Sequence, residues 1–372
     1  MSEWVTKSFD DVLALQRGHD LPASSRSSGN VPVIGSFGIT GCHDSAKYEG
    51  PGVAIGRSGA SIGKATYVEG PFWPLNTCLF VKDFKGNDPR WIYHLLDQMD
   101  FQTFNSGSAQ PSLNRHVLRS IPLRVPPVEE QRAIAEVLGA LDDKIAANTK
   151  LSVGLELLAS AEYELARASA SEKLRLSDIV TTQYGLTTSA HNAPGPKFLR
   201  VTDINKKPWI EWDSTPNCTV SESELVKYQV AAGDILVARM ADPGKAAYVD
   251  DSPPDAVFAS YLVRLKATDV KRALYTYYFL RSCEYKRYAA GAMQGSVQKN
   301  MNAKVIIATE IALPSATGLA YFTESARRLR NNVRSAQNEN RTLAALRDTL
   351  LPELMSGRLR VKDAEKKVEE VV

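Results

Sequence analysis

Two stretches of the chain place apolar or small residues at alternating intervals of four and three positions. This is the spacing of helices that pack along a partner helix. The first stretch contains Ile134, Leu138, Leu141, Ile145, Asn148, Ser152, Leu155 and Ala159. The second contains Leu329, Val333, Ala336, Asn340, Leu343 and Leu350, with Arg347 interrupting the pattern. The pattern predicts two long helices joined along a seam, each with one register-setting asparagine. The alternative is two surface helices, each packed on its own domain.

Shorter apolar runs predict the same order of elements before each long helix. In the first half, GVAIGRSG (52–59) and CLFVKD (78–83) are typical of strands, and PRWIYHLLDQM (89–99) is typical of a helix. In the second half, GDILVARM (233–240), YLVRLK (261–266) and KRALYTYYFLR (271–281) follow in the same order. The chain therefore has mixed α/β (α+β) character in both halves.

Two echoes lie between these runs. GKATYV (63–68) returns as GKAAYV (244–249), and GSAQPSLNRHVLRSIPLRVP (107–126) aligns without a gap on GSVQKNMNAKVIIATEIALP (295–314). The echoes occur in the same order and at nearly the same offset. Repeats of this kind indicate internal duplication, so we predict two similar modules.

The length of 372 residues is sufficient for two domains. We predict a first module at residues 1–127, a helix at 128–172, a second module at 173–314 and a helix at 315–372. The net charge of +3 alone indicates no nucleic-acid partner. Its distribution is more informative, because residues 128–172 carry 4 basic and 9 acidic side chains and residues 315–372 carry 11 and 8. We therefore expect the two helices to prefer each other over themselves.

Two modestly basic modules would suit DNA with two separated sites. Lysine, arginine and loop amides contact phosphates, whereas arginine, asparagine, glutamine and serine also contact base edges. Such residues gather where the two halves match. The candidates are Arg57, Lys64, Ser108, Gln110, Asn114 and Arg115 in the first module, and Arg239, Lys245, Gln294, Ser296, Gln298, Lys299, Asn300 and Asn302 in the second. For any single residue, a purely structural role in a turn or loop is the alternative.

Patterns of catalytic chemistry are absent from the sequence. GASIGKAT (59–66) resembles a phosphate-binding loop, but it has one residue too few between its glycines and Ala65 after Lys64. The histidines have no metal-ligand spacing, and Cys42-His43-Asp44 is the one cluster that invites attention. The four cysteines form no CxxC motif, so we expect ordinary buried thiols. We predict a chain with no catalytic residue, no metal and no cofactor of its own.

The sequence shows neither a signal peptide nor a run of 18 apolar residues. We therefore expect a cytoplasmic protein.

Five segments resemble a known family. PPVEEQRAIAEVLGALDDKIAANTKL (126–151) is similar to the central conserved region of the specificity subunits of type I restriction-modification systems, and LLPELMSGRLRV (350–361) is similar to the end of their second conserved region. RGHDLP, GPGVAIGRSGASIGKATYV and NSGSAQPSLNRHVLRSIPLRVPP resemble one of their target recognition domains.

The resemblance implies two target recognition domains separated by a pair of long antiparallel coiled-coil helices. It also implies a bipartite double-stranded DNA target whose unread gap is set by those helices. Such a subunit carries no active site. Its partners would be two modification subunits that methylate adenine with S-adenosylmethionine, and restriction subunits that cleave DNA with ATP and Mg. The end of the first long helix shows little of the LLPELMSG pattern, so the two docking faces are expected to differ.

Two other functions stay open at this stage. The chain would be an assembly scaffold if its modules held only protein partners and read no sequence. It would be a DNA-cleaving enzyme if the purified chain showed metal-dependent activity, although no residues support this.

Overall fold

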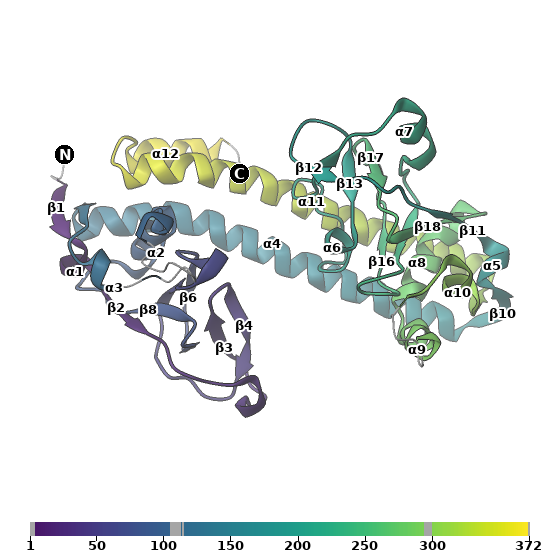
Figure 1. Cartoon of the computed structure of the whole chain (residues 1–372), viewed down its shortest axis with the longest axis horizontal. Helices are drawn as coiled ribbons and strands as arrows, with labels where there is room; N and C mark the ends of the chain where they lie inside the picture. The colour runs from purple at the N-terminus through teal and green to yellow at the C-terminus, as the bar shows by residue number, and fades with distance from the viewer. Residues whose placement is uncertain (1–3, 105–112, 114, 294–299, 371–372) are drawn as a thin grey trace. The chain divides into compact units, whose positions relative to one another are not determined.

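The structure, a computed structural model, describes residues 4–104, 113, 115–293 and 300–370. The chain forms two compact units (Figure 1). Unit 1 comprises Met1–Ala147 and Glu339–Val372, and unit 2 comprises Asn148–Asn338. Each unit contains small sheets, short helices and part of two long helices, which confirms the mixed fold class. The boundaries predicted for the two modules stay a prediction.

The described part of unit 1 contains a four-stranded antiparallel sheet, a three-stranded sheet and a two-stranded ribbon. The four-stranded sheet has the order β2 (Ala14–Arg17), β8 (Cys78–Asp83), β5 (Gly52–Gly56), β6 (Ala65–Val68). The three-stranded sheet has the order β4 (Gly38–His43), β3 (Val31–Gly35), β7 (Trp73–Pro74), and the ribbon pairs β1 (Val5–Ser8) with β9 (Pro122–Val125). The helices are α1 (Phe9–Val12), α2 (Pro89–Gln98) and α3 (Arg115–Leu118).

Unit 2 repeats this plan within its described residues. Its larger sheet has the order β11 (Val180–Tyr184), β18 (Leu262–Ala267), β15 (Ile235–Ala238), β16 (Ala246–Tyr248). A second sheet has the order β12 (Ala190–His191), β14 (Asn217–Cys218), β13 (Lys197–Leu199), β17 (Ala256–Phe258), and β10 (Ala170–Arg175) pairs with β19 (Glu310–Pro314). The helices are α5 (Leu176–Ile179), α6 (Val201–Ile204), α7 (Glu222–Tyr228), α8 (Ala273–Arg281), α9 (Cys283–Ala292) and α10 (Ala303–Ile307).

Strand register confirms the duplication. In unit 1, Ala54 of β5 pairs with Thr66 of β6, and in unit 2, Leu236 of β15 pairs with Ala247 of β16. Ala54 and Leu236 lie 182 positions apart in the sequence, and Thr66 and Ala247 lie 181 positions apart, which is close to the offset of the echoes. The two larger sheets also have the same strand order. One framework therefore underlies both units.

Local sequence explains why α2 begins where it does. The carboxylate of Asp88 accepts hydrogen bonds from the amides of Arg90 and Trp91, each at 2.9 Å, and Pro89 occupies the first helical turn. A capping aspartate followed by proline is a strong helix start. Trp91 and Ile92 are buried against the sheet, which fixes the face that α2 presents to the core of unit 1.

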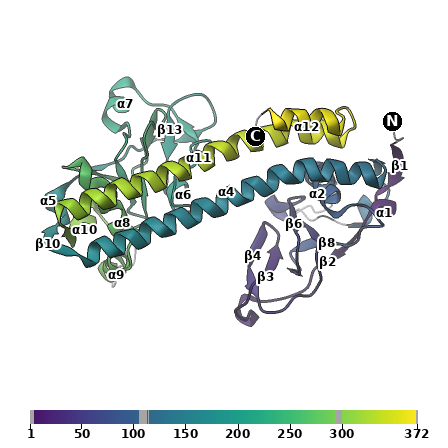
Figure 2. The same cartoon turned by 180° about the vertical axis from the view of Figure 1, so that it is seen from behind.

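The two long helices are α4 (Val128–Ala168) and α11 (Ala316–Met355), and they run antiparallel within each unit (Figure 1, Figure 2). In unit 1, Lys144 of α4 pairs with Glu339 of α11 at 3.2 Å, and Asp142 pairs with Arg347 at 2.9 Å. All ten predicted seam residues are buried or half-buried: Leu138, Leu141, Ile145, Asn148, Leu155, Leu329, Val333, Ala336, Asn340 and Leu343. The acidic first helix thus pairs with the basic second helix, as their composition predicted.

Unit 2 fixes its two helix segments with a buried charge network. Arg330 of α11 donates to Glu156 of α4 at 2.7 Å and makes a bidentate pair with Asp250 at 2.8 Å. Glu156 also accepts from Arg281 of α8 at 2.7 Å and from the Tyr278 hydroxyl at 3.4 Å. Glu156 is 3% exposed and Arg330 is 4% exposed. The network therefore joins α4, α11, α8 and the loop after β16 inside the core.

The C-terminal segment differs from the single helix expected at residues 315–372. Helix α11 ends at Met355, and the amides of Arg358 and Leu359 turn back to the carbonyl of Glu353 at 3.0 and 3.2 Å. Gly357 has a φ of 73°, a left-handed conformation that glycine adopts readily and that ends many helices. A separate helix, α12 (Val361–Glu369), follows and buries Ala364 in unit 1. The segment thus holds two helices where one was predicted.

The prediction of buried cysteines is right for Cys78 and Cys218 and wrong for the other two. Cys42 is exposed because residues 39–42 of β4 face outward, and Cys283 is exposed because it begins α9. All four thiols are free.

Substitution of Glu156 by alanine should weaken unit 2 strongly. Arg330 and Arg281 would lose a buried acceptor, and breaking a buried ion pair in this way costs about 3–5 kcal/mol. Native-state hydrogen exchange of the α8 amides in the full chain would measure this loss. Glu164→Ala is the matched control, since its pair with Arg167 is exposed and should change stability by less than about 1 kcal/mol. Equal effects of the two variants would contradict the prediction.

His94 should make the stability of unit 1 depend on pH. Burial, and then the nearby Arg90 and Arg347, lower the pKa of His94 to about 3. An unfolded histidine has a pKa of about 6.5, so between these values the unfolded chain binds a proton that the folded chain does not. Stability therefore falls as the pH is lowered through this window, by about 2 kcal/mol at pH 5.

The variant His94→Tyr isolates this effect, because Tyr278 lies six residues after the N-cap of α8, as His94 lies six residues after the N-cap of α2. Urea midpoints at pH 7 and pH 5 should differ less for the variant than for the wild type. An unchanged difference would show that His94 is not the group responsible.

Candidate nucleic-acid interface

Each unit contains a glycine–lysine turn between two strands of its larger sheet, β5 and β6 in unit 1 and β15 and β16 in unit 2. Gly63 and Gly244 have φ values of 80° and 87°, a left-handed conformation that favours glycine. Their amides donate to the last residues of β5 and β15 at 3.0 and 2.9 Å. Lys64 and Lys245 follow and are exposed. The turn explains the repeated glycine, and it presents one ammonium group at the same point of each unit.

Arg57 and Arg239 directly follow the same two strands. The carbonyl of Arg57 accepts from the amide of Leu113 at 2.8 Å, and the carbonyl of Arg239 accepts from the amide of Met301 at 2.9 Å. Leu113 and Met301 are buried and match in the second echo. Both echoes therefore meet at one place in each unit, next to a half-exposed arginine. In unit 2 the guanidinium of Arg239 also lies 4.9 Å from the ring centre of Tyr184.

The other predicted contact residues fall into three groups. Asn300 is exposed, whereas the side chain of Asn302 caps α10 by accepting from the Val305 amide at 3.0 Å. Asn302 thus has the structural role that was the alternative for single residues, with its amide nitrogen left over for other contacts. Arg115 begins α3, and only its backbone is described. Seven residues lie outside the described part of the chain: Ser108, Gln110, Asn114, Gln294, Ser296, Gln298 and Lys299.

Sequence reasoning missed a lysine-lined pocket in unit 2. The pocket has a volume of about 330 Å³ and includes Lys206, Lys207, Lys245 and Lys286 among its lining residues. Only Lys245 was singled out from the sequence, because it belongs to an echo. The neighbouring pair Lys206-Lys207 was the one local signal for the others.

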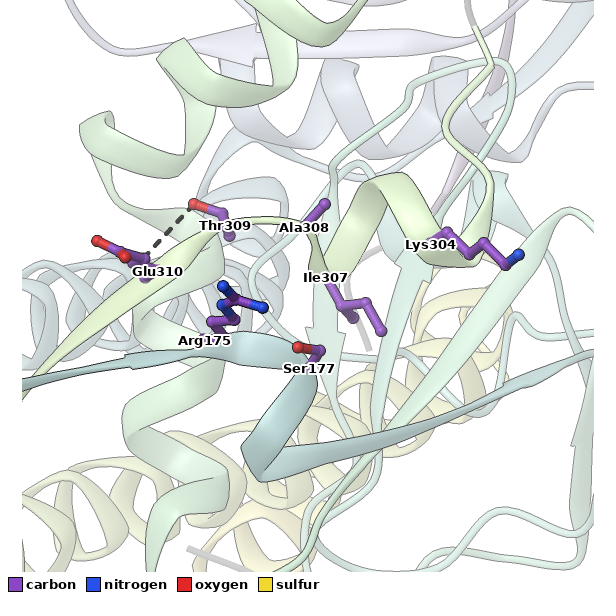
Figure 3. A pocket seen from close by; sticks show the side chains of 7 residues that line it. All are labelled: Arg175, Ser177, Lys304, Ile307, Ala308, Thr309 and Glu310. Atoms are coloured by element: carbon purple, nitrogen blue, oxygen red, sulfur yellow. Dashed lines mark hydrogen bonds between the residues drawn. The ribbon is translucent and has the colours of Figure 1, made fainter.

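A second pocket in unit 2, of about 470 Å³, holds no predicted contact residue (Figure 3). Arg175, Ser177 and Glu310 line it, and the Thr309 hydroxyl donates to the backbone carbonyl of Glu310 at 3.5 Å. In Figure 3, Lys304 points away from Arg175. An arginine next to a glutamate is poorly suited to binding a polyanion. This pocket is therefore not a candidate for DNA contacts.

The cluster around His43 does not form a nucleophile and base. The backbone amide of Ser27 donates to Nδ1 of His43 at 3.1 Å, so in the neutral ring the proton is on Nε2. Nε2 lies 3.2 Å from the Ser45 hydroxyl and acts as its donor. The ring cannot accept the serine proton in this arrangement, as an activated serine would require.

The described residues contain neither a metal-binding cluster nor a membrane-crossing helix. No group of three or more His, Cys, Asp and Glu side chains among them could hold a metal ion. None of the described helices combines the length and the apolar character needed to cross a membrane.

Part of this chain is similar in sequence to known proteins. Residues 1–157 match the family model of the type I restriction modification DNA specificity domain. The type I restriction enzyme EcoprrI specificity subunit of Escherichia coli is 28% identical over 151 residues, which is 39% of this chain and 38% of that protein. The Haemophilus influenzae protein S.HindORF215P is 30% identical over 144 residues, 37% of each chain. The matched segments thus span less than two fifths of the length of these relatives.

A solved structure extends the likeness to the whole fold. The type I restriction-modification S subunit from M. genitalium superposes with a TM-score of 0.59, over 95% of this chain and 96% of that chain. The sequences are 14% identical, so this likeness concerns the fold. The resemblance expected from the sequence is confirmed over residues 1–157, which match the type I restriction modification DNA specificity domain and are similar to specificity subunits of type I restriction enzymes.

Proposed function

We propose that this chain is the sequence-reading subunit of a type I restriction-modification enzyme and recognises a double-stranded DNA target made of two half-sites. It has no catalytic role of its own. Adenine methylation with S-adenosylmethionine, and cleavage with ATP and Mg, would be carried out by partner subunits. Each unit would read one half-site, and the paired long helices would set the unread gap.

The repeated surface of the two units is the observation that carries this proposal. Both units have an arginine after a buried strand and a lysine that follows a left-handed glycine. In both, the arginine carbonyl accepts a hydrogen bond from the amide of a buried residue, Leu113 in unit 1 and Met301 in unit 2. Arginine and lysine are the residues that contact phosphates and guanines. One framework with different side chains around it is what two readers of different short sequences need.

An exposed apolar stripe on α4 supports the docking of a modification subunit. Leu151, Gly154, Leu158, Ala161 and Leu165 follow one another at intervals of three and four, which places them on one face of the helix. The three leucines are 53%, 48% and 73% exposed. A continuous apolar stripe of this spacing is a surface onto which a helix of a partner packs.

The two long helices do not offer the same stripe. The positions 188 residues further along, on α11, are Glu339, Thr342, Leu346, Thr349 and Glu353. Four of these five are polar. We therefore propose two modification subunits that dock on unequal faces, in line with the different ends of the two helices.

Alanine substitution of Arg57 and Lys64 together should weaken recognition of one half-site. The proposal places both cations of unit 1 on DNA, and neither forms an ion pair with a described acidic side chain whose loss would disturb the fold. Cells that express the full chain with its modification subunit would be examined by single-molecule sequencing of adenine methylation. The wild type should give a split motif that disappears without the chain, and the double variant should lose the constraint on one block only.

Subunit assembly is the control for this experiment. The double variant should co-purify with the modification subunit as the wild type does. A wild-type chain that assembles but yields no chain-dependent motif would favour a scaffold without sequence reading.

Removal of seven residues from each long helix should shorten the gap between the half-sites. Deletion of residues 146–152 and 337–343 takes one heptad from each helix and keeps the seam in phase. Each helix would become shorter by about 10 Å, equivalent to about three base pairs. Methylation sequencing would measure the gap directly. A motif with its original gap would mean that the helices do not set it.

A further inference from the structure

The lysine-lined pocket of unit 2 lies beside the glycine–lysine turn that belongs to the first echo. Its walls come from residues 204–208 at the end of α6, from the turn at residues 243–246, from the end of α8 and from one face of α9. Lys245 of the glycine–lysine turn is one of its lining residues. Met293, which directly follows α9, is another. The pocket therefore shares Lys245 with the surface proposed to read DNA.

Positive charge dominates this pocket. Lys207 pairs with Glu211, and Arg281 pairs with Glu156, so these two cations are already neutralised. Lys206, Lys245 and Lys286 form no ion pair with any acidic side chain that the structure describes. Three ammonium groups around a cavity of about 330 Å³ attract an anion, because a concave wall concentrates their field.

The matching place in unit 1 is filled by a side chain. A Cβ atom built on Gly63 would lie 2.6 Å from the ring of Phe101, which is buried. In unit 2 the nearest atom to a Cβ on Gly244 is the Cβ of Ala289, at 3.2 Å. Phe101 precedes Leu113, and Ala289 precedes Met301, by the same twelve positions. Unit 2 thus has alanine where unit 1 has phenylalanine, and the missing ring leaves room for the pocket.

We propose that this pocket binds a phosphate group, and that the phosphate belongs to the backbone of the DNA that unit 2 reads. The second part rests on the proposed function. Lysine suits this task because its ammonium group acts as a compact, mobile point charge with three donors. A backbone contact would position unit 2 on its half-site without contributing to the sequence that it reads.

Two kinds of variant test the proposal in the full chain. Ala289→Phe fills the pocket with the side chain that unit 1 uses, at unchanged net charge. The double variant Lys206→Gln, Lys286→Gln keeps the pocket and removes two of its charges, so it stays informative if the filled variant folds poorly. Lys173→Gln is the matched control, because Lys173 is an exposed lysine of the same unit on β10 and lines none of the described pockets.

The first arm measures binding of a duplex that carries both half-sites, by fluorescence anisotropy over a range of KCl concentrations. Each phosphate contact contributes about 0.9 to the slope of log affinity against log salt. The double lysine variant should therefore lower this slope by one to about two units, and Ala289→Phe by about one unit. Lys173→Gln should leave the slope unchanged, and none of the variants should alter the preferred sequence.

The second arm uses inorganic phosphate alone. Phosphate should raise the melting temperature of the wild type relative to chloride of the same ionic strength, and this increase should disappear in Ala289→Phe and in the double lysine variant. Stabilisation by phosphate with an unchanged DNA slope would support the phosphate site and overturn its assignment to the DNA backbone. If the variants keep both the wild-type salt slope and the stabilisation by phosphate, the proposal is overturned. A wild type without sequence-dependent DNA binding would overturn the proposed function, while the phosphate arm would still decide on the pocket.

Discussion

The pairing of α4 with α11 is the interaction on which both units depend, because the two helices supply one wall of each core. In unit 1, Leu138 and Leu141 of α4 and Leu350 of α11 pack in the same cluster as Trp91. In unit 2, Tyr163 of α4 and Phe322 of α11 do so with the aromatic residues of α8. Sheets as small as these bury little surface by themselves. The helices therefore complete the core of each module. A substitution in the seam changes the packing of the core in the unit that contains it.

The two units reach the same fold with different chemistry at this wall. Unit 1 places the neutral His94 beside Asp142, whose carboxylate is engaged by Arg347. Unit 2 places Tyr278 at the matching point, beside a glutamate that two arginines hold. An acidic group on α4 and an arginine on α11 recur in both, whereas their neighbours have changed. Opposite charge between the helices has thus been kept while the packing around it diverged.

Sequence patterns predicted the elements that are regular and long. Strand β8 was expected at Cys78–Asp83 and lies there. The intervals of four and three indicated α4 and α11, because such spacing over several turns is typical of helices that pack along a partner. The small sheet of β3, β4 and β7 was not predicted, since its two-residue strand β7 has no periodicity of its own. The break before α12 depends on one left-handed glycine, Gly357, within a segment that otherwise favours helix.

The candidate site was predictable only where the two halves agree. Arg57, Lys64, Arg239 and Lys245 were found because each has a counterpart, whereas Lys206 and Lys286 have none that the echoes reveal. The pocket that they line exists because Ala289 has no aromatic ring, whereas the ring of Phe101 fills the matching place in unit 1. A comparison that looks for identical residues in the two repeats does not reveal a position where they differ. The contact between Ala289 and Gly244 is evident only from the structure.

The two-stranded ribbons give the chain an evolutionary property. Strand β9 leads into α4 and is paired with β1, and β19 leads into α11 and is paired with β10. Each module thus begins and ends at adjacent strands, next to the start of a long helix. Exchange of such a segment at the ribbon strands would replace everything between them and would leave the helices, with their charges and their exposed faces, unchanged. Under the proposed function, exchange of a whole module would replace one half-site in a single step, without a succession of point mutations that must each preserve assembly.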